Sequence, residues 1–394
     1  MRAADLKRVT AVPFLALLCF CSAIAVAQQS STDLPSQDVG QPGQSAASPE
    51  KSSESGQPAR PAQRHFATSI QPKVLGAGES LPTRYDPDYE DWSGPELPSG
   101  MTIESARLGN FEGKDFTREL WEVQWRDLDP IDLWVIRPPL PVVKAPVILY
   151  LYSANTNSAR YKDDNFCKFV TKNGFAAVGF VSAVTGQRFH DRAQRENFVS
   201  ELPEALATTT HDVQMVLNFL EKREDLDLTR VGIWADGSGA SIAIMAAAVD
   251  QRIKAIDLID PWGDWPDWLA KSPLVPEDNR SYFVSPYFQK LVENLDPVKW
   301  FPKVKTPKVR LEYVKDGVVV TPAIAREKMV SSAPRNTEIV YYDSTANFIS
   351  EVVAKGSGFD WVKRNALSAE VRSEEQSKAT THGVQGLTTT LDPR

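Results

Sequence analysis

The middle of the chain alternates between short apolar runs and longer segments with one apolar face. Continuous apolar runs such as residues 147–152 (VILYLY) predict strands that are buried on both faces of a sheet. Segments in which apolar residues recur every three or four positions predict amphipathic helices. Such strands are expected at 147–152, 175–182, 230–234, 253–259, 309–314 and 338–342, and helices at 164–172, 202–223, 238–249, 322–332 and 347–363.

This order of elements predicts an α/β fold with a doubly wound, mostly parallel sheet. Residues 101–108, 117–125 and 131–137 alternate polar and apolar side chains, so they are expected to be antiparallel strands at the N-terminal side. The segment at about 262–302 is rich in Trp, Pro and Tyr and lies between two strands. We expect it to be a lid insertion over the carboxyl edge of the sheet, where ligands bind in such folds.

The N-terminus has the features of a secretory signal. Arg2, Lys7 and Arg8 precede a largely apolar stretch, and Ala-Val-Ala at 25–27 matches a cleavage site. An uncleaved anchor is the alternative, but the apolar stretch has about 17 residues and a span needs roughly 20. The sequence therefore predicts a signal peptide at 1–27 and an exported protein, periplasmic or secreted, with no membrane contact after cleavage.

Two further segments are poor in large apolar residues and rich in polar ones. Residues 28–69 are rich in Ser, Gln and Pro and predict a disordered linker, and 368–394 predict a disordered tail. The folded domain is then expected at 70–367. After cleavage Cys167 is the one cysteine left, so no intramolecular disulfide forms.

The net charge of −7 argues against a nucleic-acid partner, which needs clustered Lys and Arg. Four acidic residues fall near the expected carboxyl ends of strands and offer oxygen ligands of the kind that Ca²⁺ prefers. Their spacing matches no metal motif, so we expect neither a metal nor another cofactor. These residues are Asp236, Asp260, Asp264 and Asp316.

Residues 230–241 (RVGIWADGSGAS) give a strand, a tight turn and a helix of small residues. The segment resembles the nucleophile elbow of the α/β-hydrolase superfamily, in the branch of prolyl-oligopeptidase-like peptidases, acetylxylan esterases and dienelactone hydrolases. The resemblance covers roughly residues 115 to 365. It places Gly237 at the nucleophile position, with Ala235 and Gly239 in the two flanking glycine positions. Gly237 is therefore expected to keep the turn but to lack the side chain that acts as nucleophile.

The resemblance also implies where the other catalytic groups belong. Asp316, in the loop after a late strand, occupies the position of the acid. The family pattern D-S-G-H-N-F is replaced by Asp-Ser-Thr-Ala-Asn-Phe at 343–348, so Ala346 stands where the catalytic histidine belongs. The His-Gly pair of the oxyanion loop is replaced by residues 152–155 (YSAN). Three departures at one site predict a degraded triad.

Two hypotheses of different class follow. The first is a pseudoenzyme that binds or scaffolds a small molecule, peptide or carbohydrate in its cleft, with contacts from Tyr152, Asn155, His190, Trp262 and Asp316. The second is a working esterase or peptidase in which Ser238 is a displaced nucleophile, His190 the base and Asp316 the acid. Ser238 also fits an ordinary helix N-terminus, and Trp262 also fits packing of the lid. Acid–base chemistry by Asp236 and Asp316 is a third possibility, supported by the carboxylates alone.

Overall fold

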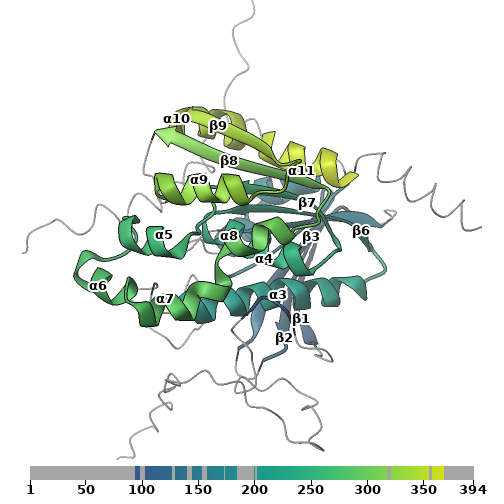
Figure 1. The fold of residues 1–394 in the computed structure, drawn as a ribbon. Helices are drawn as coiled ribbons and strands as arrows, with labels where there is room; N and C mark the ends of the chain where they lie inside the picture. The colour runs from purple at the N-terminus through teal and green to yellow at the C-terminus, as the bar shows by residue number, and fades with distance from the viewer. Residues whose placement is uncertain are drawn as a thin grey trace, which may run out of the picture.

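The computed structural model describes residues 94–97, 103–126, 129–139, 144–152, 158–172, 174–183, 199, 202–316, 321–354 and 357–367. Within these residues nine strands form one sheet, in the order β1-β2-β3-β5-β4-β6-β7-β8-β9 (Figure 1). The strands are β1 (Glu104–Glu112), β2 (Thr117–Gln124), β3 (Ile131–Arg137), β4 (Ala145–Leu151), β5 (Ala176–Phe180), β6 (Leu226–Asp236), β7 (Ile253–Ile259), β8 (Lys308–Asp316) and β9 (Glu338–Ser344).

The first part of the sheet is antiparallel and the rest is parallel. β1, β2, β3 and β5 pair antiparallel in turn, whereas β5, β4, β6, β7, β8 and β9 run parallel. The doubly wound sheet with antiparallel N-terminal strands is therefore confirmed. Because β5 and β6 lie on opposite sides of β4, the winding direction reverses there, and the carboxyl ends of β4 and β6 flank the crevice at which such sheets bind ligands.

Helices cover both faces of the sheet. The helices are α2 (Asp164–Thr171), α3 (Leu202–Glu221), α4 (Ser238–Val249), α5 (Trp265–Lys271), α6 (Arg280–Phe283), α7 (Pro286–Val292), α8 (Pro297–Trp300), α9 (Ala323–Ser332), α10 (Thr345–Phe348) and α11 (Ser357–Leu367). The core under α3 and α4 and the core under α2 and α11 are separate clusters, because successive strand residues point to opposite faces. In Figure 1, α3, α4, α8 and α9 lie in front of the sheet.

The Trp- and Pro-rich insertion between β7 and β8 is observed as a run of short helices, α5 to α8. α5, α6 and α7 contact one another, α7 contacts α3, and α8 contacts α4 and α9. Trp262, Trp265 and Trp268 are at most 2% exposed and belong to the core under α3 and α4. The three rings pack the insertion onto the body of the domain.

Several element boundaries differ from the sequence prediction. The single helix expected at 347–363 is divided into α10, the π-helical segment Ile349–Ala354 and α11. The sequence contains Gly356 and Gly358 in this stretch, and glycine weakens a continuous helix. β6 also begins earlier than expected, at Leu226, because Leu226 and Asp227 pair with the first two residues of β4.

β1 is the outer strand on one side of the sheet and is exposed on both faces. Its pairing with β2 shifts between Arg107 and Gly109, which leaves Leu108 as the extra residue of a bulge, 56% exposed.

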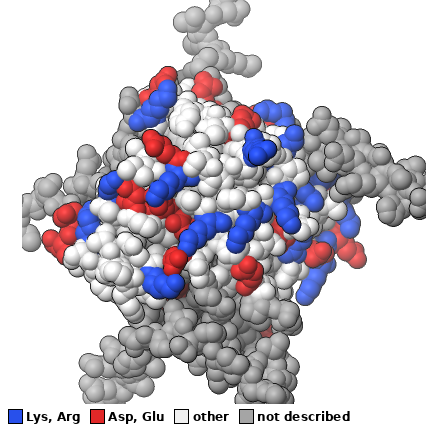
Figure 2. All heavy atoms as spheres, in the orientation of Figure 1, with Lys and Arg blue, Asp and Glu red and all other residues white. Residues whose placement is uncertain are grey.

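Charge is mixed on the face drawn in Figure 2, where basic side chains form a band across the middle and acidic side chains gather beside it. Neither sign covers this face continuously. None of the helices formed by the described residues is both long and apolar enough to cross a bilayer. The predicted signal peptide, linker and tail lie outside the described residues.

Candidate functional site

A sharp turn joins β6 to α4, as the sequence predicted. β6 ends at Asp236, α4 begins at Ser238, and Gly237 between them has φ 54° and ψ −120°. An L-residue with a side chain is strained at these angles, whereas glycine adopts them at little cost. The apex of the elbow is therefore built, and it carries no side chain.

Close contacts hold this elbow against two neighbouring strands. The Gly237 amide donates to the Ile259 carbonyl at 2.8 Å. A Cβ atom placed on Gly239 would lie 2.3 Å from the carbonyl oxygen of Leu151, so the start of α4 touches the backbone at the end of β4. Ser241 fixes the next turn of α4, since its hydroxyl donates to the Trp262 carbonyl at 2.6 Å.

Ser238, which the second hypothesis uses as nucleophile, is the first residue of α4 and is fully buried. His190 and Asn155 lie outside the described residues, so their approach to Ser238 stays a prediction. His211 is buried in α3, with its Nε2 3.2 Å from the Gly94 carbonyl oxygen, which gives this imidazole a structural contact.

The acid and base positions of the resemblance fall at the ends of adjacent strands. Asp316 ends β8 and pairs in register with Ser344, which ends β9. The side chain of Asp316 is not among the described parts of the chain. Ala346 follows Ser344 in the short helix α10 and is exposed. The backbone thus brings a methyl group, not an imidazole, to the edge of the sheet next to Asp316.

The two predicted contact residues that are described lie mostly inside the protein. Tyr152, after β4, is 8% exposed, and the Arg160 guanidinium carbon lies 3.5 Å from the centre of its ring. Trp262 is 2% exposed and stacks on Trp268 with a centroid distance of 5.0 Å. Their contact with a ligand stays a prediction.

The turn after β7 lies in the same region, and the sequence did not predict its backbone conformation. Asp260 has φ 42°, in the left-handed region that favours glycine. Its amide donates to the Glu312 carbonyl at 2.9 Å, and its carboxylate lies 3.6 Å from Nε of Arg326. Burial raises the pKa of Asp260 to about 6, and the charge of Asp236 adds to this, while Arg326 and Thr321 oppose it.

Asp264 is the second non-glycine residue with positive φ, at 54°. The carboxylate of Asp296 accepts from the amides of Asp264 and Trp265, at 2.9 and 3.2 Å. Lys328 donates to the Asp264 carboxylate at 2.8 Å. Two strained backbone positions four residues apart are thus held by the side chain of Asp296, which caps α8, and by side chains from α9. Strain of this kind is commonly found at ligand sites.

Tyr313 borders the same turn from β8. Its side chain is fully buried, its ring stacks on Tyr341 at 6.0 Å, and the Arg326 guanidinium carbon lies 5.3 Å from its ring centre. Burial, followed by the charge of Asp260, raises its pKa well above the usual value for tyrosine, so the phenol stays neutral. Across the described residues, no group of three or more His, Cys, Asp or Glu side chains is arranged to hold a metal ion.

No model of a known protein family matches the sequence. An uncharacterised 31.7 kDa protein in the traX-finO intergenic region of Escherichia coli is 33% identical over 91 residues, which are 23% of this chain and 29% of that protein. The match therefore spans less than a third of the relative.

Solved structures match over a larger share of the chain. The acetyl xylan esterase from Paenibacillus sp. R4 has a TM-score of 0.51 and 16% identity, over 70% of this chain and 91% of that one. Acetyl xylan esterase 1 from Thermoanaerobacterium sp. JW/SL YS485 has a TM-score of 0.49 and 15% identity, over 71% of this chain and 95% of that one. At this level of identity the first likeness is evidence for a shared fold and for nothing finer.

Proposed function

We propose that this chain is an exported protein that binds a ligand without hydrolysing it. The proposal starts from its α/β-hydrolase fold, which the sequence predicted. One observation carries the proposal: Gly237 occupies the apex of the elbow at φ 54°. Acyl transfer through a covalent intermediate needs a nucleophilic side chain at this point and a base within hydrogen-bond reach of it. Glycine supplies no nucleophile there.

The other two members of the site support the same proposal. Ala346 offers a methyl group in place of the base. Ser238 is fully buried at the start of α4, and a hydroxyl without solvent access is poorly placed to attack a substrate. Gly239 keeps α4 against Leu151, so the turn retains its shape while the reactive groups are gone.

The ligand would meet the carboxyl ends of the parallel strands, where such folds bind small molecules. Asp260, whose side chain is 24% exposed, offers one polar contact there. Tyr152, Asn155, His190, Trp262 and Asp316 are the contacts that the sequence predicts. We propose a small molecule, peptide or carbohydrate as the ligand class, bound by hydrogen bonds and aromatic contacts.

A fluorophosphonate probe tests the absence of a reactive serine, since it labels activated serine hydroxyls covalently. We expect the purified wild-type chain to remain unlabelled, as Ser238→Ala does. Labelling of the wild type that disappears in Ser238→Ala would reverse the proposal and establish the serine hydrolase that uses Ser238 with His190 and Asp316.

The reciprocal experiment restores both missing groups. Gly237→Ser combined with Ala346→His returns a hydroxyl to the apex and an imidazole to the end of β9, so we expect the double variant to become labelled. Gly237→Ser alone should label far more slowly because no base activates the hydroxyl. Equal labelling of the single and double variants would show that position 346 is not the base position.

Export has its own test. Expressed in a Gram-negative host, the full chain should be recovered from the periplasm or medium with Gln28 as its first residue, as mass spectrometry of the N-terminal peptide would establish. Recovery from the cytoplasm with residues 1–27 intact would contradict export and leave the ligand-binding proposal standing.

A further inference from the structure

A concave site that is open to solvent lies far from the elbow. It is a cavity of about 450 Å³ between β1, β2 and the end of α3, within the size range of pockets for small ligands. Asp225 lines it and, through its carbonyl, accepts from the amide of Ala145 at the amino end of β4. The eleven residues of β6 separate Asp225 from Gly237, which at about 3.3 Å per residue is roughly 35 Å. The two sites therefore lie at opposite edges of the sheet.

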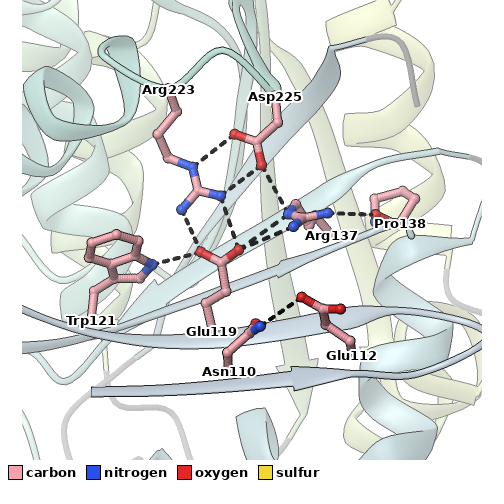
Figure 3. A network of polar contacts seen from close by, with 8 residues as sticks. All are labelled: Asn110, Glu112, Glu119, Trp121, Arg137, Pro138, Arg223 and Asp225. Atoms are coloured by element: carbon pink, nitrogen blue, oxygen red, sulfur yellow. Dashed lines mark hydrogen bonds and ion pairs between the residues drawn. The ribbon is translucent and has the colours of Figure 1, made fainter. Parts of the chain in front are cut away.

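The floor of this cavity is a closed set of ion pairs (Figure 3). Arg223 contacts Glu119 at 2.6 Å and Asp225 at 2.7 Å, and Arg137 contacts the same two carboxylates at 3.3 and 2.9 Å. Burial opposes ionisation of Glu119, but hydrogen bonds from Arg223 and Trp121 outweigh it and lower the pKa of this carboxyl group. Two cations and two anions thus form a rigid floor without net charge.

The wall of the cavity is aromatic and aliphatic. Trp121 and Phe219 meet edge to face with ring centres 5.2 Å apart, and Ile103 lies beside them. The indole of Trp121 donates to Glu119 at 2.7 Å, which fixes the orientation of its ring. The guanidinium carbons of Arg107 and Arg223 lie 5.8 and 5.7 Å from the centre of the Trp121 ring, so a planar apolar group packs on the parts of the two rings that these cations leave open.

The rim carries two exposed cations that no carboxylate of the described residues pairs with. Arg107 and Lys222 both line the cavity, both are exposed, and neither forms an ion pair within the described part of the chain. Glu224 is the one carboxylate beside them at the rim. The cavity therefore has an excess of one positive charge, in a chain whose net charge is −7.

We propose that this cavity binds a small aromatic carboxylate, with its ring against Trp121 and Phe219 and its carboxylate facing Arg107 and Lys222. A hydrophobic wall selects the ring, and the rim cations select the anion. The proposal does not depend on the state of the elbow, because the two sites share no residue.

Calorimetric titration of the full chain with 2-naphthoate tests the proposal, with uncharged 2-naphthamide as the matched ligand. We expect 2-naphthoate to bind at millimolar concentration or below, and 2-naphthamide, which has the same ring system, to bind more weakly. Either of two results with the wild-type protein would overturn the proposal: no heat of binding from 2-naphthoate, or equal affinities for the two compounds.

Variants at the rim locate the binding. Arg107→Gln and Lys222→Gln each remove an exposed cation and should weaken 2-naphthoate binding by roughly two- to fivefold. Arg335→Gln, an exposed arginine after α9 that forms no ion pair in the described part of the chain, is the matched control and should bind as wild type does. Affinity that survives both rim substitutions would place the bound naphthoate elsewhere and overturn the assignment.

Discussion

Two turns at the carboxyl edge of the sheet both contain residues with positive φ, but they use different residue types there. At the elbow the chain reverses at a residue with φ 54°, and that residue, Gly237, has no side chain. At the neighbouring turn after β7 the chain takes φ 42° and 54° at Asp260 and Asp264, and both keep carboxylates. The two turns touch, since the Gly237 amide donates to the Ile259 carbonyl. Glycine therefore avoids backbone strain at the elbow and offers no side chain there, whereas the turn after β7 keeps strained backbone and two carboxylates.

This contrast indicates where ligand recognition should be sought. Strained non-glycine residues persist when the surrounding structure holds them, and they are enriched at functional sites. Asp264 is held by Asp296 and Lys328, and Asp260 faces Arg326. Asp264 is 5% exposed, so Asp260, with a side chain that is 24% exposed, is the carboxylate of this turn that is open to solvent.

Gly239→Ala should give the largest effect, because its Cβ would lie 2.3 Å from a backbone oxygen of Leu151, which cannot move aside cheaply. We expect a loss of about 3 kcal/mol or more in the free energy of unfolding, measured by urea denaturation. Gly109→Ala in β1 is the control, since its Cβ would meet Leu120 at an ordinary 3.8 Å. Similar losses in both variants would mean that close packing of α4 on β4 does not hold the elbow.

Gly237→Ala tests whether glycine keeps the backbone strain of the elbow low. Alanine at φ 54° and ψ −120° should cost about 2 kcal/mol of unfolding free energy through backbone strain. Circular dichroism during urea titration measures the change. A neutral result would show that the turn relaxes to other angles, and the comparison with Asp260 and Asp264 would fail.

Asp264→Gly and Asp264→Ala remove the same carboxylate and the same contact with Lys328. They differ in the cost of positive φ, so the alanine variant should be less stable than the glycine variant by about 1 kcal/mol. Thermal and urea unfolding of the pair measure that difference. Equal stabilities would mean that the left-handed backbone at this turn stores no strain.

Asp260→Asn should change stability by an amount that depends on pH. The pKa of Asp260 is raised to about 6, so the folded state holds a proton that the unfolded state releases near pH 4, and wild-type stability falls as pH rises through this window. Asparagine keeps the shape and never ionises. Its stability relative to wild type should therefore rise by about 3 kcal/mol from about pH 4 to about pH 8. A flat difference in stability across this range would exclude a raised pKa.

Much of the architecture was predictable because it rests on periodicity. The bounds of β3, β7 and α4 match the apolar pattern, and the small residues of α4 follow the turn as the elbow motif requires. The break between α10 and α11 does not follow from the sequence, because the apolar pattern continues through it despite Gly356 and Gly358. Local patterns report burial better than they report backbone continuity.

The site was predictable at Gly237 and not at Asp260. A glycine in a recognisable motif carries its own backbone requirement, so its positive φ follows from the sequence. Asp260 precedes a proline, which favours extended backbone, and its φ of 42° arises from contacts with β8 and α9 that are distant in sequence. The raised pKa of Asp260 likewise depends on burial that no local pattern encodes.

The bulge in β1 has a consequence for how this protein meets other copies of itself. An outer strand with regularly spaced, unpaired backbone N–H and C=O groups can pair with a strand from another molecule, which then extends the sheet. The extra residue Leu108 breaks that regular spacing halfway along β1, and Glu104, Arg107 and Glu112 place charges along it. Edge-to-edge growth of the sheet into larger aggregates is therefore disfavoured on this side of the molecule.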